Sequence, residues 1–361
     1  MPTISRNDLA DGTEEGGLRF RASRPDDGDG LVDLFAAVYG EHWRERTSSW
    51  RYLPPAPCRS LIWVAESDGR IVGAQPSHEV ALRFDGEVLR GSLLLDVMTH
   101  PDYRRRGVFS GVVEGLRRAL HADGIHALLT TPNHLAARGF ATLPAWQLAG
   151  ELVPLVLPVR WKALILPDGR SGPGAPAGGG ESRESPAAGR AAPRPAAEDP
   201  RAQTLWRRFS AWSGTCIVRD PAFLAWRFGG HAGRPYHVEA CGSPTEWTAL
   251  AVTTPGRLLN RRVLFLADLI AASPDGPELT DLLGAVARQA ADRGEAAVVA
   301  YMAPDSRLIG ALRRSGFRTV PRLLRPRPYA VWMATDLAGE SAARLRRLAG
   351  WHMTLADSDL A

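Results

Sequence analysis

The stretch Pro167–Pro200 is the feature that most constrains how this chain can fold. Of its 34 residues, 25 are Gly, Pro, Ala or Ser, and none is aromatic or Val, Ile, Leu or Met. Such a segment cannot bury enough apolar surface to offset the entropy lost when it becomes ordered. We therefore predict a flexible linker at 167–200 between an N-terminal domain, 1–166, and a C-terminal domain, 201–361. Two domains also suit a length of 361 residues.

The positive charge of the chain is carried almost entirely by arginine. Lys162 is the only lysine among 44 basic residues, which face 39 acidic ones for a formal charge of +5. A uniform preference for Arg is typical of GC-rich coding, and without a motif or an aromatic-lined basic patch the charge predicts no nucleic-acid partner.

Several protein classes are excluded by what the sequence lacks. No apolar run reaches the 18 residues of a transmembrane helix, and the polar, acidic residues 1–17 do not resemble a secretory signal. The three cysteines are widely spaced, so they predict neither a disulfide framework nor a metal site. We expect a cytoplasmic protein with no metal and no membrane partner.

Landmarks recur in the same order in the two halves. They are an aromatic-Arg-aromatic tripeptide, a strand ending in Asp, an amphipathic helix, and an aromatic residue about 50 positions after the Asp. The residues are Trp50-Arg51-Tyr52, Asp96 and Trp146 in the first half, and Trp226-Arg227-Phe228, Asp268 and Phe317 in the second. This self-similarity predicts duplication of one fold.

Hydrophobic periodicity predicts an α+β fold for the first half. Strands are expected at Leu18–Ala22, Leu61–Ala65, Ile71–Ala74, Ala81–Phe84, Val88–Met98 and His126–Thr130, with a hairpin turn at Asp85-Gly86 and helices over residues 31–38 and 108–120. The result is a mostly antiparallel meander followed by a strand–helix–strand crossover. In the second half, a helix is expected over residues 279–290, with Gly294 at its end.

Three consecutive arginines, Arg104, Arg105 and Arg106, precede Gly107 and the start of a helix. A cation beside a helix N-terminus costs about 0.3–1 kcal/mol, and a bound anion removes that conflict. Free backbone amides, Gly107 and the guanidinium groups together predict a phosphate cradle. The alternative is an exposed basic turn before a helix whose small residues pack on a sheet. Gly111 and Gly115 extend a bare stripe along the helix, where a ligand or another backbone could approach.

The pattern P-x-[YF]-R-x-R-G-[VIL] between strand and helix resembles the acyl-CoA loop of GNAT N-acyltransferases. Arg104 and Gly107 match the family pattern Q/R-x-x-G-x-G/A, whereas Phe109 replaces its last small residue. A second family landmark is matched by Asn133 and Ala136, with Phe140 at the position of the family's tyrosine and Ala145-Trp146 in place of Gly-Phe. The resemblance covers residues 18–160 and implies two GNAT-like domains, each a twisted, mostly antiparallel mixed sheet flanked by helices.

The resemblance also implies acetyl-CoA as co-substrate and assigns roles to residues. By the resemblance, Val97, Met98 and Thr99 bind the thioester oxygen and the pantetheine arm, and Asn133 binds the far end of the pantetheine. The residues that bind the pyrophosphate are Arg104, Arg105, Arg106, Gly107, Val108, Phe109 and Ser110. Asp96 is the candidate general base. Phe140 cannot donate a proton, so the general acid is unassigned, with Ser110 and His134 as weak substitutes.

The second half lacks this loop. Acidic Asp275 and Glu278 stand near its corresponding helix start, where they suit the helix dipole and would repel phosphates. We expect a degenerate GNAT-like domain without cofactor. Residues 351–359 resemble the closing strand of tandem proteins of this kind, and their aromatic and acidic side chains either face a shared cleft or belong to an edge strand.

The sequence therefore predicts an acyl-CoA-dependent N-acyltransferase that moves an acetyl group to the amine of a small molecule. Two alternatives remain. One is a non-catalytic acyl-CoA sensor, favoured by the missing tyrosine. The other is a FemX-like aminoacyl transferase, against which the intact loop argues. The sequence predicts no oligomeric state.

Overall fold

The computed structural model describes residues 13–40, 59–160, 199–229, 235–325 and 328–358. Contacts divide the chain into two compact units, the first made of residues 1–150 and 330–347 and the second of 151–329 and 348–361. This division differs from the contiguous domains 1–166 and 201–361, which stay a prediction. The expected linker 167–200 lies outside the described residues except for Asp199 and Pro200, which are the N-cap and first residue of helix α6.

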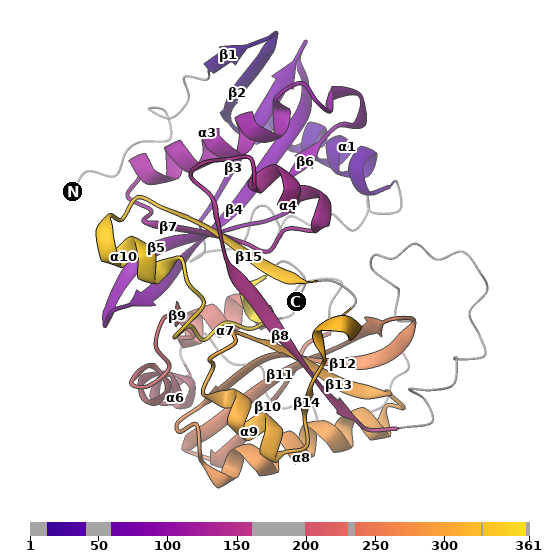
Figure 1. The fold of residues 1–361 in the computed structure, drawn as a ribbon, viewed down its shortest axis with the longest axis vertical. Helices are drawn as coiled ribbons and strands as arrows, with labels where there is room; N and C mark the ends of the chain where they lie inside the picture. The colour runs from indigo at the N-terminus through magenta and orange to yellow at the C-terminus, as the bar shows by residue number, and fades with distance from the viewer. Residues whose placement is uncertain (1–12, 41–58, 161–198, 230–234, 326–327, 359–361) are drawn as a thin grey trace. The chain divides into compact units, whose positions relative to one another are not determined.

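The first unit is built on one mixed sheet (Figure 1). Its strands are β1 (Thr13–Glu15), β2 (Leu18–Ala22), β3 (Ser60–Ser67), β4 (Arg70–Phe84), β5 (Glu87–Leu94), β7 (Ala127–Thr130) and β15 (Tyr329–Thr335), in that spatial order. All neighbours are antiparallel except β5 and β7, and β6 (Met98–Thr99) pairs with β4. The Asp85-Gly86 hairpin and the strands near Leu18–Ala22, Leu61–Ala65 and His126–Thr130 are confirmed. The strands expected at Ile71–Ala74 and Ala81–Phe84 are one continuous strand, β4, and the strand expected to reach Met98 ends at Leu94 because the chain leaves the ladder there.

Helices cover both faces of this sheet. They are α1 (Gly28–Tyr39), α3 (Val108–Ala122), α4 (His134–Phe140) and α10 (Gly339–Leu345), with 3-10 turns η1 (Pro25–Asp27) and η3 (Pro101–Tyr103). On one face, α1 buries Leu34 and Phe35 against Ile62 of β3. On the other, α3 buries Leu116 against Trp63, the next residue of β3. Alternate residues of β3 thus enter different cores, which explains its continuous apolar sequence.

The glycine stripe of α3 is filled by aromatic rings. A Cβ at Gly111 would lie 2.1 Å from the ring of Phe20, and one at Gly115 would lie 2.1 Å from Nε1 of Trp63. Gly115 is itself buried. The expectation that a ligand or another backbone approaches this stripe is therefore wrong, because β2 and β3 already occupy it with packed side chains.

The second unit has its own mixed sheet, in the order β8 (Gln147–Pro158), β13 (Ala297–Met302), β12 (Arg261–Ala271), β11 (Glu246–Leu258) and β10 (His237–Ser243), with β14 (Arg318–Thr319) also on β8. The parallel pair is β12 with β13. The remaining elements are β9 (Cys216–Ile217), α6 (Pro200–Ser210), α7 (Pro221–Phe228), α8 (Pro277–Asp292), α9 (Leu308–Arg314), η4 (Arg322–Leu324) and η5 (Leu355–Asp357). The expected helix ending before Gly294 is confirmed as α8. Among the described residues, no helix has the length and apolarity that a membrane span needs.

The two units repeat one order of elements. The sequence β3-β4-β5-α3-β7-α4 of the first corresponds to β10-β11-β12-α8-β13-α9 of the second, and Trp146 and Phe317 are buried immediately before β8 and β14. Trp226-Arg227-Phe228 lies in α7, whereas Trp50-Arg51-Tyr52 is outside the described residues.

One strand from each half completes the other half's sheet. β8 follows the first-half elements in sequence but pairs with β13. β15, yellow in Figure 1, follows the second-half elements but pairs with β7, with Trp332 opposite Thr130.

The packing of α3 predicts an unequal response to two Gly→Ala substitutions. Gly115→Ala forces the buried Trp63 ring to move and should lower the free energy of unfolding by about 1–3 kcal/mol. The matched control is Gly284→Ala in α8, where the nearest atom to the new Cβ is a terminal nitrogen of Arg288 at 3.5 Å. There the better helix propensity of Ala should raise stability by up to about 1 kcal/mol. Chemical denaturation measures both, and equal shifts would contradict this account of the stripe.

Candidate functional site

The turn before α3 has the backbone shape of an anion-binding nest. Arg105 and Gly107 adopt left-handed conformations, with φ of 63° and 79°. Such a conformation is uncommon for a residue other than glycine and, alternating with ordinary residues, turns successive N–H groups inward. Gly107 is the N-cap of α3 and offers no side-chain cap. Among the described residues, the amides of residues 105–110 have no hydrogen-bond acceptor. The helix start therefore presents free donors.

The three arginines of this turn are exposed and carry uncompensated charge. Within the described residues, none of Arg104, Arg105 and Arg106 forms an ion pair. Arg106 lies over the Tyr103 ring, 5.2 Å from its centroid. Free amides and unpaired guanidinium groups at one helix start form a site suited to a phosphate group.

A β-bulge separates β5 from β6. Leu94 is opposite Ser77 on β4, and Met98 is opposite Ala74, so three residues of one chain segment face two residues of β4. The middle one, Asp96, has a left-handed φ of 31°. The N–H of Val97 has no hydrogen-bond acceptor among the described residues.

The bulge lies close to the nest. Helix α3 packs against β6, and Val108 in its first turn lies against Gly73 of β4. Pairing between β5 and β7 covers only Gly91–Leu93. The structure thus brings residues 96–99 and the start of α3 together at the same end of the sheet.

The other predicted site residues have structural contacts. Oδ1 of Asn133 accepts hydrogen bonds from the amides of Leu135 and Ala136, at 3.0 Å each, and so caps α4. Its role toward pantetheine stays a prediction. Ser110 Oγ donates to the carbonyl oxygen of Gly107 at 2.9 Å. His134 is exposed in the first turn of α4.

Phe109 and Phe140 form one packing unit. Their rings meet edge to face with centroids 5.3 Å apart, and Phe140 also packs on Trp146. Phe109 lies over Gly139, where a Cβ would be 2.5 Å from the ring. The two departures from the family pattern are thus linked, because the aromatic residue at 109 packs against the one at 140.

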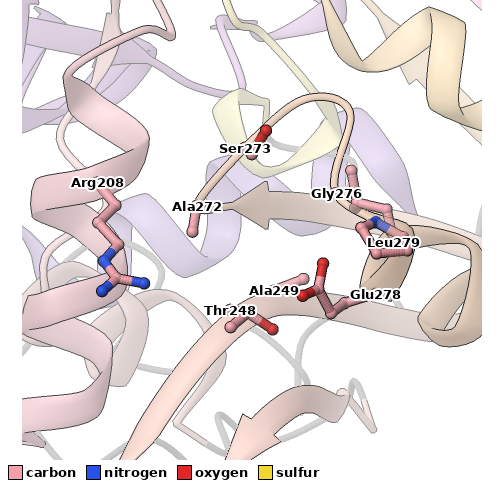
Figure 2. Close-up of a pocket in the computed structure, with 9 residues that line it drawn as sticks. Arg208, Thr248, Ala249, Ala272, Ser273, Gly276, Glu278 and Leu279 are labelled. Atoms are coloured by element: carbon pink, nitrogen blue, oxygen red, sulfur yellow. The ribbon is translucent and has the colours of Figure 1, made fainter.

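The corresponding helix start of the second unit is occupied by acidic side chains. Asp275 pairs with Arg314 at 3.2 Å, and Oε2 of Glu278 lies 2.7 Å from where a Cβ of Gly276 would be. A pocket of about 390 Å³ lies beside this start, between α6, β11 and α8. Figure 2 shows the Glu278 carboxylate directed toward β11 and the Arg208 side chain on the opposite side. The acidic groups here suit the helix dipole without any bound anion.

Asp268, the counterpart of Asp96 in the repeat, is a buried structural residue. It forms ion pairs with Arg219 at 3.3 Å, and Arg219 reaches Asp357 at 2.6 Å, with all three side chains at most 2% exposed. Burial would raise the pKa of the Asp268 carboxyl, but the charge of Arg219 and the His352 ring 3.7 Å away hold that pKa well below its usual range. Nothing in the apolar run before Arg219 predicted this contact.

The C-terminal segment fills the region between β12 and β13. Their pairing ends at Leu266 and Ala300, and η5 packs against both strands. Thr354 Oγ1 donates to Asp268 at 2.9 Å, and Arg227 donates to the carbonyl oxygens of Ala356 and Ser358. The expected closing strand is therefore wrong for residues 351–358, which form one bridge and a buried 3-10 turn because side chains bind their backbone. Asp359 lies outside the described residues.

Comparisons with known proteins agree with this geometry. Residues 19–140 match the family model of the acetyltransferase (GNAT) domain. No curated protein matches the chain in sequence. Among solved structures, Saccharomyces cerevisiae N-myristoyltransferase with bound myristoyl-CoA is similar at 13% identity and a TM-score of 0.60, over 98% of this chain and 89% of that one.

Two bacterial GCN5-related N-acetyltransferases are also similar in fold. The one from Anabaena variabilis has 11% identity and a TM-score of 0.58, over 87% of this chain and 72% of that one. The one from Kribbella flavida has 14% identity and a TM-score of 0.52, over 89% and 72%. The family match shows a GNAT domain at residues 19–140, and the solved structures, all below 25% identity, show a shared fold.

The buried cluster of the second unit predicts a pH-dependent response to Arg219→Met. At neutral pH this change leaves Asp268 and Asp357 buried without a countercharge, so the free energy of unfolding should fall by about 3–5 kcal/mol. In the wild type, the depressed pKa of Asp268 gives stability that is present above the unfolded value of about 3.9 and lost as the pH falls through the folded value. In the variant, the Arg219 charge that lowers the pKa of the Asp268 carboxyl is gone, so this buried group should gain a proton at a higher pH than in the wild type and the deficit should shrink as the pH falls.

Chemical denaturation at pH 7 and at pH 5.5 measures this deficit. Arg208→Met is the control, because the Arg208–Glu246 pair is half exposed and should contribute no more than about 1 kcal/mol. An Arg219→Met deficit as small as that of the control would contradict the structural role of the cluster.

Proposed function

We propose that the protein is an N-acetyltransferase that uses acetyl-CoA and acts on the amine of a small molecule. The observation that carries the proposal is the helix start at Arg104–Gly107, where free amides in a nest meet three unpaired guanidinium groups. A diphosphate supplies the anion that this charge distribution lacks. The FemX-like alternative gains no support from such a site.

In the proposed mechanism, the nest and the first turn of α3 bind the pyrophosphate of CoA. The free N–H of Val97 points its dipole at the thioester oxygen, where negative charge develops as the amine attacks. Met98 and Thr99, held on β4, guide the pantetheine arm. Asp96, at the bend of the bulge, takes the proton of the attacking amine. With Phe140 buried in the core, water protonates the leaving thiolate.

We also propose that the second unit is a degenerate GNAT-like domain without a cofactor. Its repeated order of elements supports a common fold, and the acidic start of α8 together with the segment packed between β12 and β13 supports the loss of CoA binding. One molecule of acetyl-CoA per chain is then expected. The acceptor is a small amine, and the acetyl group is the acyl group we expect.

Acetyl-CoA should raise the melting temperature of the wild type, and Arg105→Glu should abolish that rise. The substitution replaces an unpaired cation of the nest by an anion that repels the pyrophosphate. Arg118→Glu is the matched control, because Arg118 is also exposed on α3 but lies about three turns beyond the nest. It should keep the full shift. Absence of a shift in the wild type, or its equal loss in both variants, would contradict the cofactor site.

Asp96→Asn should lower kcat about 10²- to 10⁴-fold, because the amide cannot accept the amine proton. Asn tolerates the left-handed conformation of residue 96, so the bulge should persist. Thiol release from acetyl-CoA over a panel of small amines measures kcat, and the thermal shift with acetyl-CoA should equal that of the wild type. Unchanged kcat would remove Asp96 from the mechanism.

The same amine panel separates the enzyme from a sensor. A wild type that binds acetyl-CoA and acylates at least one amine is the expected result. Binding without acylation of any amine would favour the non-catalytic sensor, which the phenylalanine at position 140 already makes the second candidate.

A further inference from the structure

Gln75 lies on β4 directly beside the bulge and has no part in the mechanism described so far. Its side chain is 1% exposed. The side-chain Nε2 donates two hydrogen bonds, to the carbonyl oxygen of Leu95 at 2.6 Å and to that of Pro76 at 2.9 Å. Its Oε1 has no partner among the described residues. A buried side-chain amide whose oxygen has no hydrogen-bond donor is unfavourable in a core. The presence of glutamine at this position therefore needs an explanation.

The explanation is the proline that follows. The N–H of Leu95 donates to the carbonyl oxygen of Pro76 at 3.0 Å. In an antiparallel ladder, two residues bonded in this way exchange both N–H···O bonds. Pro76 has no N–H, so the return bond to the Leu95 carbonyl cannot form from the backbone. The Nε2 of Gln75 supplies that bond instead.

The Gln75 side chain thus takes the place of a backbone donor at the point where β5 stops pairing with β4. Proline inside a sheet is confined to edges and bulges, and here it is opposite the bulge at Asp96. The bond from Gln75 fixes the Leu95 carbonyl, and with it the peptide plane that leads into Asp96. The left-handed conformation of Asp96 then sets the direction of the Val97 N–H.

We propose that Gln75 is a positioning residue of the acyl-transfer site, which holds the bulge so that the Val97 N–H meets the thioester oxygen. Gln75 acts through Leu95 and Asp96 and touches no reacting atom. The catalytic part of this inference rests on the proposed function. The structural part, that Gln75 replaces the missing N–H of Pro76, rests on the hydrogen bonds alone.

A double-mutant cycle tests the inference, because Pro76→Ala restores the backbone N–H that Gln75 replaces. Gln75→Met keeps the length of the side chain and removes both donated bonds. In the wild-type background, this change should speed amide hydrogen exchange over residues 95–99. It should lower kcat about 10- to 100-fold, as expected when a reacting group is misplaced, with a much smaller change in KM for acetyl-CoA. In the Pro76→Ala background, the same change should have far smaller effects on both measurements.

The two readouts separate failure of this inference from failure of the proposed function. Equal effects of Gln75→Met in both backgrounds, or no effect on exchange at residues 95–99, would overturn the positioning role even in an active enzyme. A wild type that neither binds acetyl-CoA nor acylates an amine would overturn the proposed function. The exchange cycle would then still decide whether Gln75 holds the bulge.

Discussion

The short parallel pairing of two central strands is the constraint on which each unit depends. In the first unit, β5 and β7 pair over three residues before β5 enters the bulge at Asp96. In the second, β12 and β13 also pair over three residues, but η5 packs against both strands and Asp268 is locked by Arg219. In both units the two parallel strands therefore separate after three paired residues. The separation is followed by a bulge with a free N–H at Val97 in the first unit and by a buried ion cluster in the second.

Arginines have two different roles in this chain, and burial decides which one applies. Arg104, Arg105 and Arg106 are exposed beside free amides, where a planar cation suits a phosphate. Arg219 and Arg227 are buried and satisfied by the C-terminal segment, which they hold in place. A fully buried guanidinium without such partners would cost several kcal/mol. The arginine-rich composition therefore gives no measure of how many arginines meet a ligand.

Local patterns predicted the elements of the fold and the position of the nest, because periodicity, glycine and charge are local properties. They did not predict that β8 and β15 each pair with a strand of the other half, because the sequence of an apolar strand does not specify which strand it pairs with. Gln75 was missed for a related reason: its amide replaces a backbone donor across the sheet. The available signal was Pro76, because a proline within a buried strand indicates a bulge. The burial of Arg219 depends on Asp357, which lies 138 residues away in sequence.

The strand exchange limits what truncation can reveal about the two halves. A chain ending after β8 would lack β15, so the backbone of β7 that pairs with Trp332 and Met333 would lose its partners. An exposed strand edge of this kind invites aggregation. Loss of acetyl-CoA binding in such a fragment would then report on the first-unit sheet and not on the second unit. Point substitutions in the full chain, at Arg219 or at the start of α8, leave β15 in place and therefore address the second unit directly.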